Sequence, residues 1–154
     1  MMEKKELISK FDKIFTAWGF KRKNTSWSKI EKDCVLLLVL RKNRWREHYF
    51  FEIDMSFQKD LNGSFFINPK NIDFSVAANR LIPDLDTEML DRALDLEISN
   101  DENLNKLIVF LMNRLPQYLS KISNITEFRE MYEQGLLKGA AIAPFARKVM
   151  NIPW

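Results

Sequence analysis

Apolar residues recur at helical spacing over residues 4–18, and this pattern predicts an amphipathic helix near the start of the chain. Its apolar face comprises six large side chains: Leu7, Ile8, Phe11, Ile14, Phe15 and Trp18. Gly19 follows the last of them, at a position where helices commonly end on a residue with positive φ. We expect this face to belong to the core.

A spacing of two then replaces the helical spacing and predicts strands. In residues 49–57 every second side chain is large and apolar, whereas residues 35–41 form a continuous aliphatic run that is typical of a central strand. Shorter strands are expected at 25–30 and 72–80, and turns at 60–63 and 68–71. Because the first three strands are joined by short connections, the pattern favours a four-stranded antiparallel meander.

Helical spacing returns after Pro83, over residues 87–96, 99–115, 124–135 and 140–150. Residues 99–102 have the form of a capping box with Ser99 as its first residue, and Pro116 should kink or break the helix that follows. Strands grouped together and helices grouped together predict an α+β fold. We therefore expect one domain over 1–154, with an N-terminal helix, a four-stranded antiparallel meander sheet and C-terminal helices packed on one face.

Composition narrows the chemistry of this 154-residue chain. It has one cysteine, Cys34, and one histidine, His48, which excludes an internal disulfide and a closed zinc site built from such ligands. Cys34 begins the most apolar strand, so we expect a small core residue there. The longest apolar run, residues 34–40, is far shorter than the roughly 20 residues of a membrane helix, and no signal peptide is evident. We expect a cytoplasmic protein with no cofactor, no metal and no membrane contact.

Charge is divided unevenly along the chain. The net charge is +3, but residues 1–50 hold 13 basic against 6 acidic residues, and residues 84–102 hold eight carboxylates with one arginine. The antiparallel order should bring two basic stretches to one rim of the sheet. The predicted partner-binding residues are Lys21, Arg22, Lys23, Arg41, Lys42, Arg44, Trp45 and Arg46. Such a rim suits an acidic protein surface or a nucleic acid. Two alternatives stay open: Trp45 folds back on the core, or the carboxylates of 84–102 neutralise the rim.

Catalytic motifs are absent from the sequence, including the nucleophile elbow, the zinc-protease motif and the glycine-rich phosphate loops. By parity, His48, Glu52 and Asp54 share one face of the strand at 49–57, which would suit a hydrolase. A solvated polar sheet face explains the same pattern, and we predict no catalytic residue.

Residues 19–27 read Gly-Phe-Lys-Arg-Lys-Asn-Thr-Ser-Trp and resemble the opening of the uncharacterised bacterial domain-of-unknown-function family 4304. Residues 39–45 with 49–53 are similar to its second hairpin, 74–83 to its fourth strand and 115–122 to its Leu-Pro helix. The resemblance covers about residues 5–135, and residues 136–154 depart from it. It implies an α+β fold and carries over no functional residue. The genes that neighbour similar families often suggest immunity proteins of toxin systems.

The sequence thus predicts a non-enzymatic protein-binding module, with the role of an immunity-type inhibitor of a bacterial toxin. An inhibitor acts by covering a site, which needs complementary charge and a few anchoring side chains. The alternative is a nucleic-acid-binding accessory protein that uses the basic sheet edge. The oligomeric state is left open.

Overall fold

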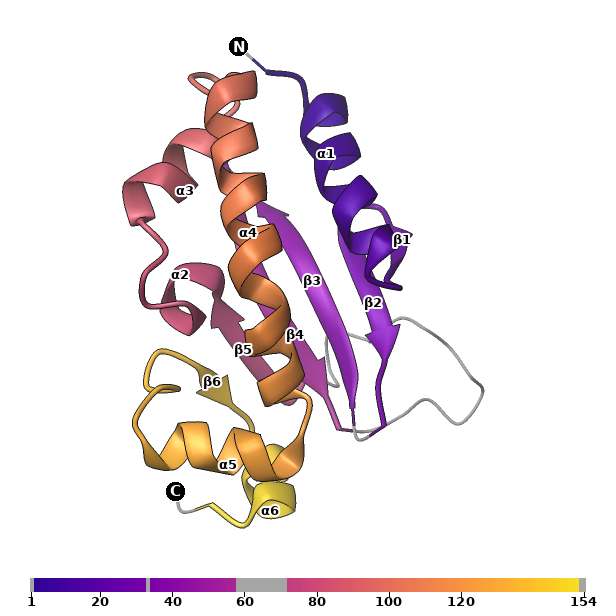
Figure 1. The fold of residues 1–154 in the computed structure, drawn as a ribbon, viewed down its shortest axis with the longest axis vertical. Helices are drawn as coiled ribbons and strands as arrows, with labels where there is room; N and C mark the ends of the chain where they lie inside the picture. The colour runs from indigo at the N-terminus through magenta and orange to yellow at the C-terminus, as the bar shows by residue number, and fades with distance from the viewer. Residues whose placement is uncertain (1, 33, 58–71, 153–154) are drawn as a thin grey trace.

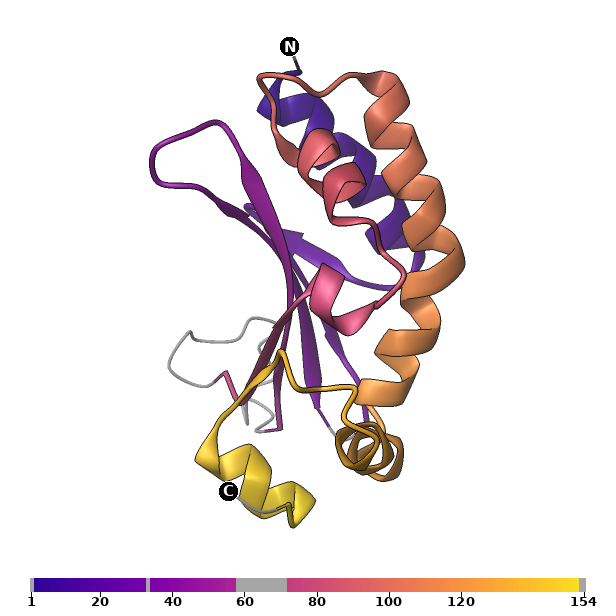
Figure 2. The same ribbon diagram turned by 90° about the vertical axis from the view of Figure 1, so that its left-hand side faces the viewer.

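Helices cover one face of an antiparallel sheet in the computed structural model, which describes residues 2–32, 34–57 and 72–152 (Figures 1 and 2). The elements are α1 (Lys4–Ala17), β1 (Lys21–Lys23), β2 (Ser26–Ile30), β3 (Val35–Lys42), β4 (Tyr49–Ser56), β5 (Phe74–Ala77), α2 (Ala78–Leu81), α3 (Thr87–Leu94), α4 (Asp101–Ile122), α5 (Ile125–Glu133), β6 (Ala141–Ile142) and α6 (Pro144–Met150). The predicted α+β class is confirmed. The turns predicted at 60–63 and 68–71 lie outside the described residues.

The sheet has six strands in the order β1-β2-β3-β4-β5-β6, so the prediction of four was wrong. The meander is extended at both edges by short strands. Asn24, with φ of 56°, turns the chain back so that Arg22 of β1 pairs with Trp27 of β2. β1 consists of three exposed cationic residues and β6 of two residues, so neither has an apolar alternation that could have predicted it.

Several helix boundaries also differ from the expected ones. The strand predicted at 72–80 ends at Ala77, and α2 begins at the next residue, Ala78. The last helix begins only at Pro144. Pro116 lies within α4 without ending it, because the buried leucine stripe of this 22-residue helix continues on both sides. Asn100, and not Ser99, caps α4 by accepting a hydrogen bond from the Asn103 amide. In the described parts of the chain, no helix is both long and apolar enough to span a membrane.

The core lies between the sheet and the layer formed by α1 and α4. The predicted face of α1 is confirmed, and the Phe15 ring lies 5.1 Å from that of Trp27 and 5.8 Å from that of Phe51. The apolar face of β4 is confirmed as well, since Tyr49, Phe51, Ile53 and Met55 are all buried. The opposite face is solvated only in part, because Asp54 and Ser56 are buried too. Cys34 is buried, as expected. These contacts fix which faces of β2 and β4 point toward the helices.

Replacing Phe11 by Ala should lower the free energy of unfolding by about 3–5 kcal/mol, because this ring is fully buried between α1 and the sheet. Urea denaturation measures the loss, and Lys13→Ala on the exposed side of α1 is the matched control. A loss below about 1 kcal/mol would place α1 outside the core.

Candidate functional site

The hairpin of β3 and β4 projects beyond the rest of the sheet, on the side away from the helices (Figure 2). Its loop, residues 43–48, is closed by its own polar groups. The Asn43 amide donates to the His48 carbonyl oxygen at 2.7 Å, and the Asn43 side chain accepts from the Trp45 amide at 2.8 Å. An ion pair of 2.9 Å joins Lys42 and Glu47. The conformation of the loop is therefore set locally.

The second half of the loop, residues 46–48, is fastened to the segment between α3 and α4. The Leu96 amide donates to the Glu47 carbonyl oxygen at 2.8 Å, and His48 forms an antiparallel bridge with Asp95. Arg46 donates to the carboxylate of Asp95 at 2.8 Å, and the Asp95 side chain is only 8% exposed. A largely buried carboxylate thus holds Arg46, which orients the hairpin.

Trp45 lies at the tip with 83% of its surface exposed, so the alternative that it folds back on the core is wrong. The guanidinium of Arg44 lies 5.5 Å from the centre of its ring, in a cation–π contact. Phe50 on the same hairpin is 45% exposed and pairs with Arg41 across the two strands. Sequence reasoning did not select Phe50, although it interrupts the otherwise polar face of β4.

Ion pairs within the described residues hold at least four of the eight predicted binding residues. The pairs are Arg22 with Asp12 (3.7 Å), Arg41 with Glu52 (3.0 Å), Lys42 with Glu47 (2.9 Å) and Arg46 with Asp95 (2.8 Å). Asp95 is the one partner in this set that belongs to residues 84–102, so neutralisation is mainly local. Arg44 has no carboxylate partner among the described residues.

The three cations of β1 do not share one rim with the hairpin loop. Arg22 lies on the helix side, against Asp12 of α1, and Lys21 and Lys23 have the opposite parity. The register aligns Lys23 with Glu52 and Lys21 with Asp54, but β2 and β3 lie between β1 and these residues of β4. The structure therefore brings together the residues of the β3–β4 hairpin and leaves the three cations of β1 on the edge strand.

The proposed acid–base set is divided between two environments. His48 contacts the Phe50 ring, and its Nε2 lies 3.8 Å from Asp91 of α3. Glu52 and Asp54 instead face Arg41, which makes two hydrogen bonds to Glu52 and lies 3.8 Å from Asp54. Burial raises the pKa of Asp54, and Ser75 and Arg41 offset this only in part. Among the described residues, no group of three His, Cys, Asp or Glu side chains could hold a metal ion.

Comparisons with known proteins add no relative. No family model matches the chain, and neither the curated proteins nor the solved structures contain a match to it. The resemblance to family 4304 therefore stays a prediction, and the candidate site rests on its geometry.

Two single substitutions should distinguish Arg46, which orients the hairpin, from Arg44 at its tip. Arg46→Ala should lower the free energy of unfolding by about 1 kcal/mol, because it leaves the largely buried Asp95 without its cation. Arg44→Ala should leave it within about 0.5 kcal/mol of the wild type, since Arg44 has no carboxylate partner in the described structure. Equal losses in urea denaturation would contradict the assignment.

Asp54→Asn should raise the melting temperature at pH 7. Because the folded state raises the pKa of Asp54, ionising this buried group disfavours folding at neutral pH, and that cost disappears as the pH falls through the raised pKa. The gain should therefore shrink on acidification. Glu52→Gln is the control, and it should lower the melting temperature by weakening the pair with Arg41. A loss in Asp54→Asn at pH 7 would show that attraction to Arg41 outweighs burial.

Proposed function

We propose that this chain is a non-enzymatic protein-binding module that docks through the tip of the β3–β4 hairpin. The observation that carries the proposal is the 83% exposure of Trp45 on a loop that the neighbouring Arg46 fastens to Asp95. Tryptophan and arginine dominate the energetics of protein interfaces, and Arg44 accompanies Trp45 at the tip. A loop that is already ordered loses little conformational freedom on binding.

The pairing of the cations supports a compact protein partner. Arg41, Lys42 and Arg46 already contact carboxylates of their own chain. The surface that remains offers Arg44 beside the exposed ring of Trp45. Its complement is an apolar pocket with a carboxylate at its rim, as an acidic protein surface provides.

The role that we propose for such docking is that of a cytoplasmic immunity-type inhibitor, which covers the active surface of a bacterial toxin. Covering a site needs an anchoring side chain and a rigid support, and no chemistry of its own. The resemblance to family 4304 points the same way, and the partner would be encoded beside this chain.

A nucleic-acid-binding accessory protein is the second candidate, favoured by the contact between Arg44 and Trp45. An exposed aromatic ring next to an arginine can stack on unpaired bases. Binding of this kind weakens steeply with salt, which separates it from docking to a protein.

Photo-crosslinking tests the proposal in the organism that encodes the chain. A benzophenone amino acid at position 45 should give one dominant protein adduct. The same group at position 145, an exposed site on α6, should not give that adduct. The purified partner should then bind the Arg44→Ala/Trp45→Ala variant at least about tenfold more weakly than Phe145→Ala.

Both variants should keep the wild-type melting temperature, because their side chains are exposed. Unchanged affinity of the folded double variant would overturn the proposal. Salt-sensitive binding of a single-stranded oligonucleotide that depends on Trp45 would favour the second candidate instead.

A further inference from the structure

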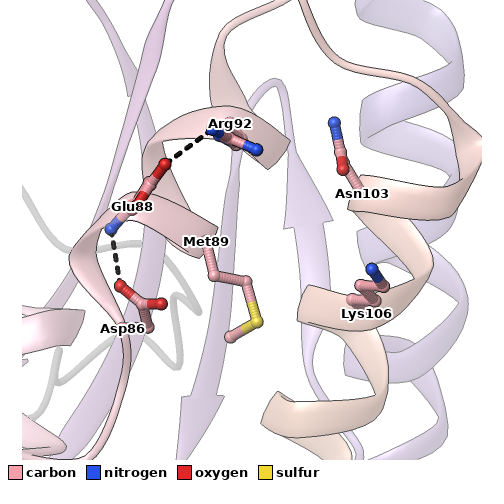
Figure 3. Close-up of a pocket in the computed structure, with 6 residues that line it drawn as sticks. All are labelled: Asp86, Glu88, Met89, Arg92, Asn103 and Lys106. Atoms are coloured by element: carbon pink, nitrogen blue, oxygen red, sulfur yellow. Dashed lines mark hydrogen bonds and ion pairs between the residues drawn. The ribbon is translucent and has the colours of Figure 1, made fainter.

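A hollow between α3 and α4 lies on the helical side of the molecule. Its larger part has a volume of about 690 Å³, with apolar walls formed by Met89, Val109 and Phe110. A second part of about 310 Å³ adjoins it and shares Met89 and Lys106 (Figure 3). Val109 is 56% exposed, so this apolar surface is open to solvent.

The rim of this hollow carries an unpaired negative charge. Glu88 pairs with Arg92 at 2.6 Å, and Glu102 pairs with Lys106 at 3.3 Å. Asp86 accepts a hydrogen bond from the Glu88 amide, and no cation pairs with it in the described structure. The hollow thus combines apolar walls with a carboxylate that lacks a counterion.

The hairpin tip is complementary to this hollow in apolar character and charge. Trp45 supplies a large exposed ring, and Arg44 supplies a cation that lacks a carboxylate partner among the described residues. The hairpin tip does not enter the hollow of its own chain, because the hairpin projects from the sheet on the side away from α4 (Figure 2). Any such contact must therefore join two molecules.

We infer that the hairpin tip of one copy docks into the α3–α4 hollow of a second copy, with Trp45 against Met89, Val109 and Phe110 and Arg44 toward Asp86. This inference rests on the proposed function, since it names a second copy as one partner of the same tip. The two surfaces differ, so the contact is head-to-tail and each copy keeps one surface free for the next. Self-docking also covers the tip until a tighter partner displaces the second copy.

Complementary variants test the inference by sedimentation velocity. The wild type should form larger species as its concentration rises. Trp45→Ala removes the tip and Val109→Lys blocks the hollow, so each variant alone should stay monomeric over the same range. An equimolar mixture of the two retains one intact tip and one intact hollow, and should form 1:1 dimers that do not grow further. The dimer should dissociate at least about tenfold more readily when Arg44→Ala is added to the chain with the intact tip.

Gln117→Lys, an exposed position on α4 outside the hollow, is the matched control and should assemble as the wild type does. All variants should keep the wild-type melting temperature. A wild type that stays monomeric, or a mixture that fails to form dimers, would overturn the inference. If Trp45→Ala still loses the crosslinked partner in that case, the proposed function stands and self-docking alone fails. If the mixture forms dimers but the foreign partner ignores Trp45, the docking role of the tip is confined to self-association.

Discussion

The packing of α1 against the centre of the sheet is the contact on which the rest of the structure depends. Phe11 and Phe15 of α1 meet the Phe51 ring of β4, and Phe15 also meets Trp27 of β2. Asp12 holds the Trp27 indole from the edge of the same helix, at 2.9 Å. A slip of one residue in strand register would turn these rings away from α1. The aromatic cluster therefore fixes which faces of β2 and β4 point toward α1, and β3 lies between these two strands.

That fixed hairpin explains how a basic loop is accommodated in a folded chain. Lys42 is neutralised by Glu47 of the loop, and Arg41 is neutralised by Glu52 of the neighbouring strand. Arg46 is neutralised by Asp95, which belongs to a distant segment. Each pair removes a repulsive charge, and the last one also sets the direction of the tip. Trp45 takes no part in these pairs and is left exposed, supported by a loop that its own polar groups close. The order of the loop and the exposure of Trp45 thus arise from the same set of contacts.

The sequence predicted the elements with a clear hydrophobic pattern, among them α1, the apolar run of β3, the alternating β4 and the leucine stripe of α4. The edge strand β1 was missed because Lys-Arg-Lys has no apolar face, and Pro116 did not end α4 because tertiary packing outweighs a local helix breaker. At the site, the residue types were found but their roles were not. The role of Arg46 differs from that of Arg44 because Arg46 contacts Asp95, 49 residues away in the chain. No local sequence pattern indicates that contact.

The distribution of paired and unpaired charge bears on the kind of partner that the tip can recognise. The seven excess positive charges of residues 1–50 indicate long-range attraction to any polyanion. At the hairpin, however, carboxylates of the same chain neutralise much of the positive charge. What remains is a short-range surface, Trp45 with Arg44, whose binding depends on shape and on a single charge. A polyanion offers no pocket to such a surface, and it gains little from cations that are already paired. A folded partner that buries the indole gains most of its binding energy from that one ring, which is why the tip is better suited to a protein than to a nucleic acid.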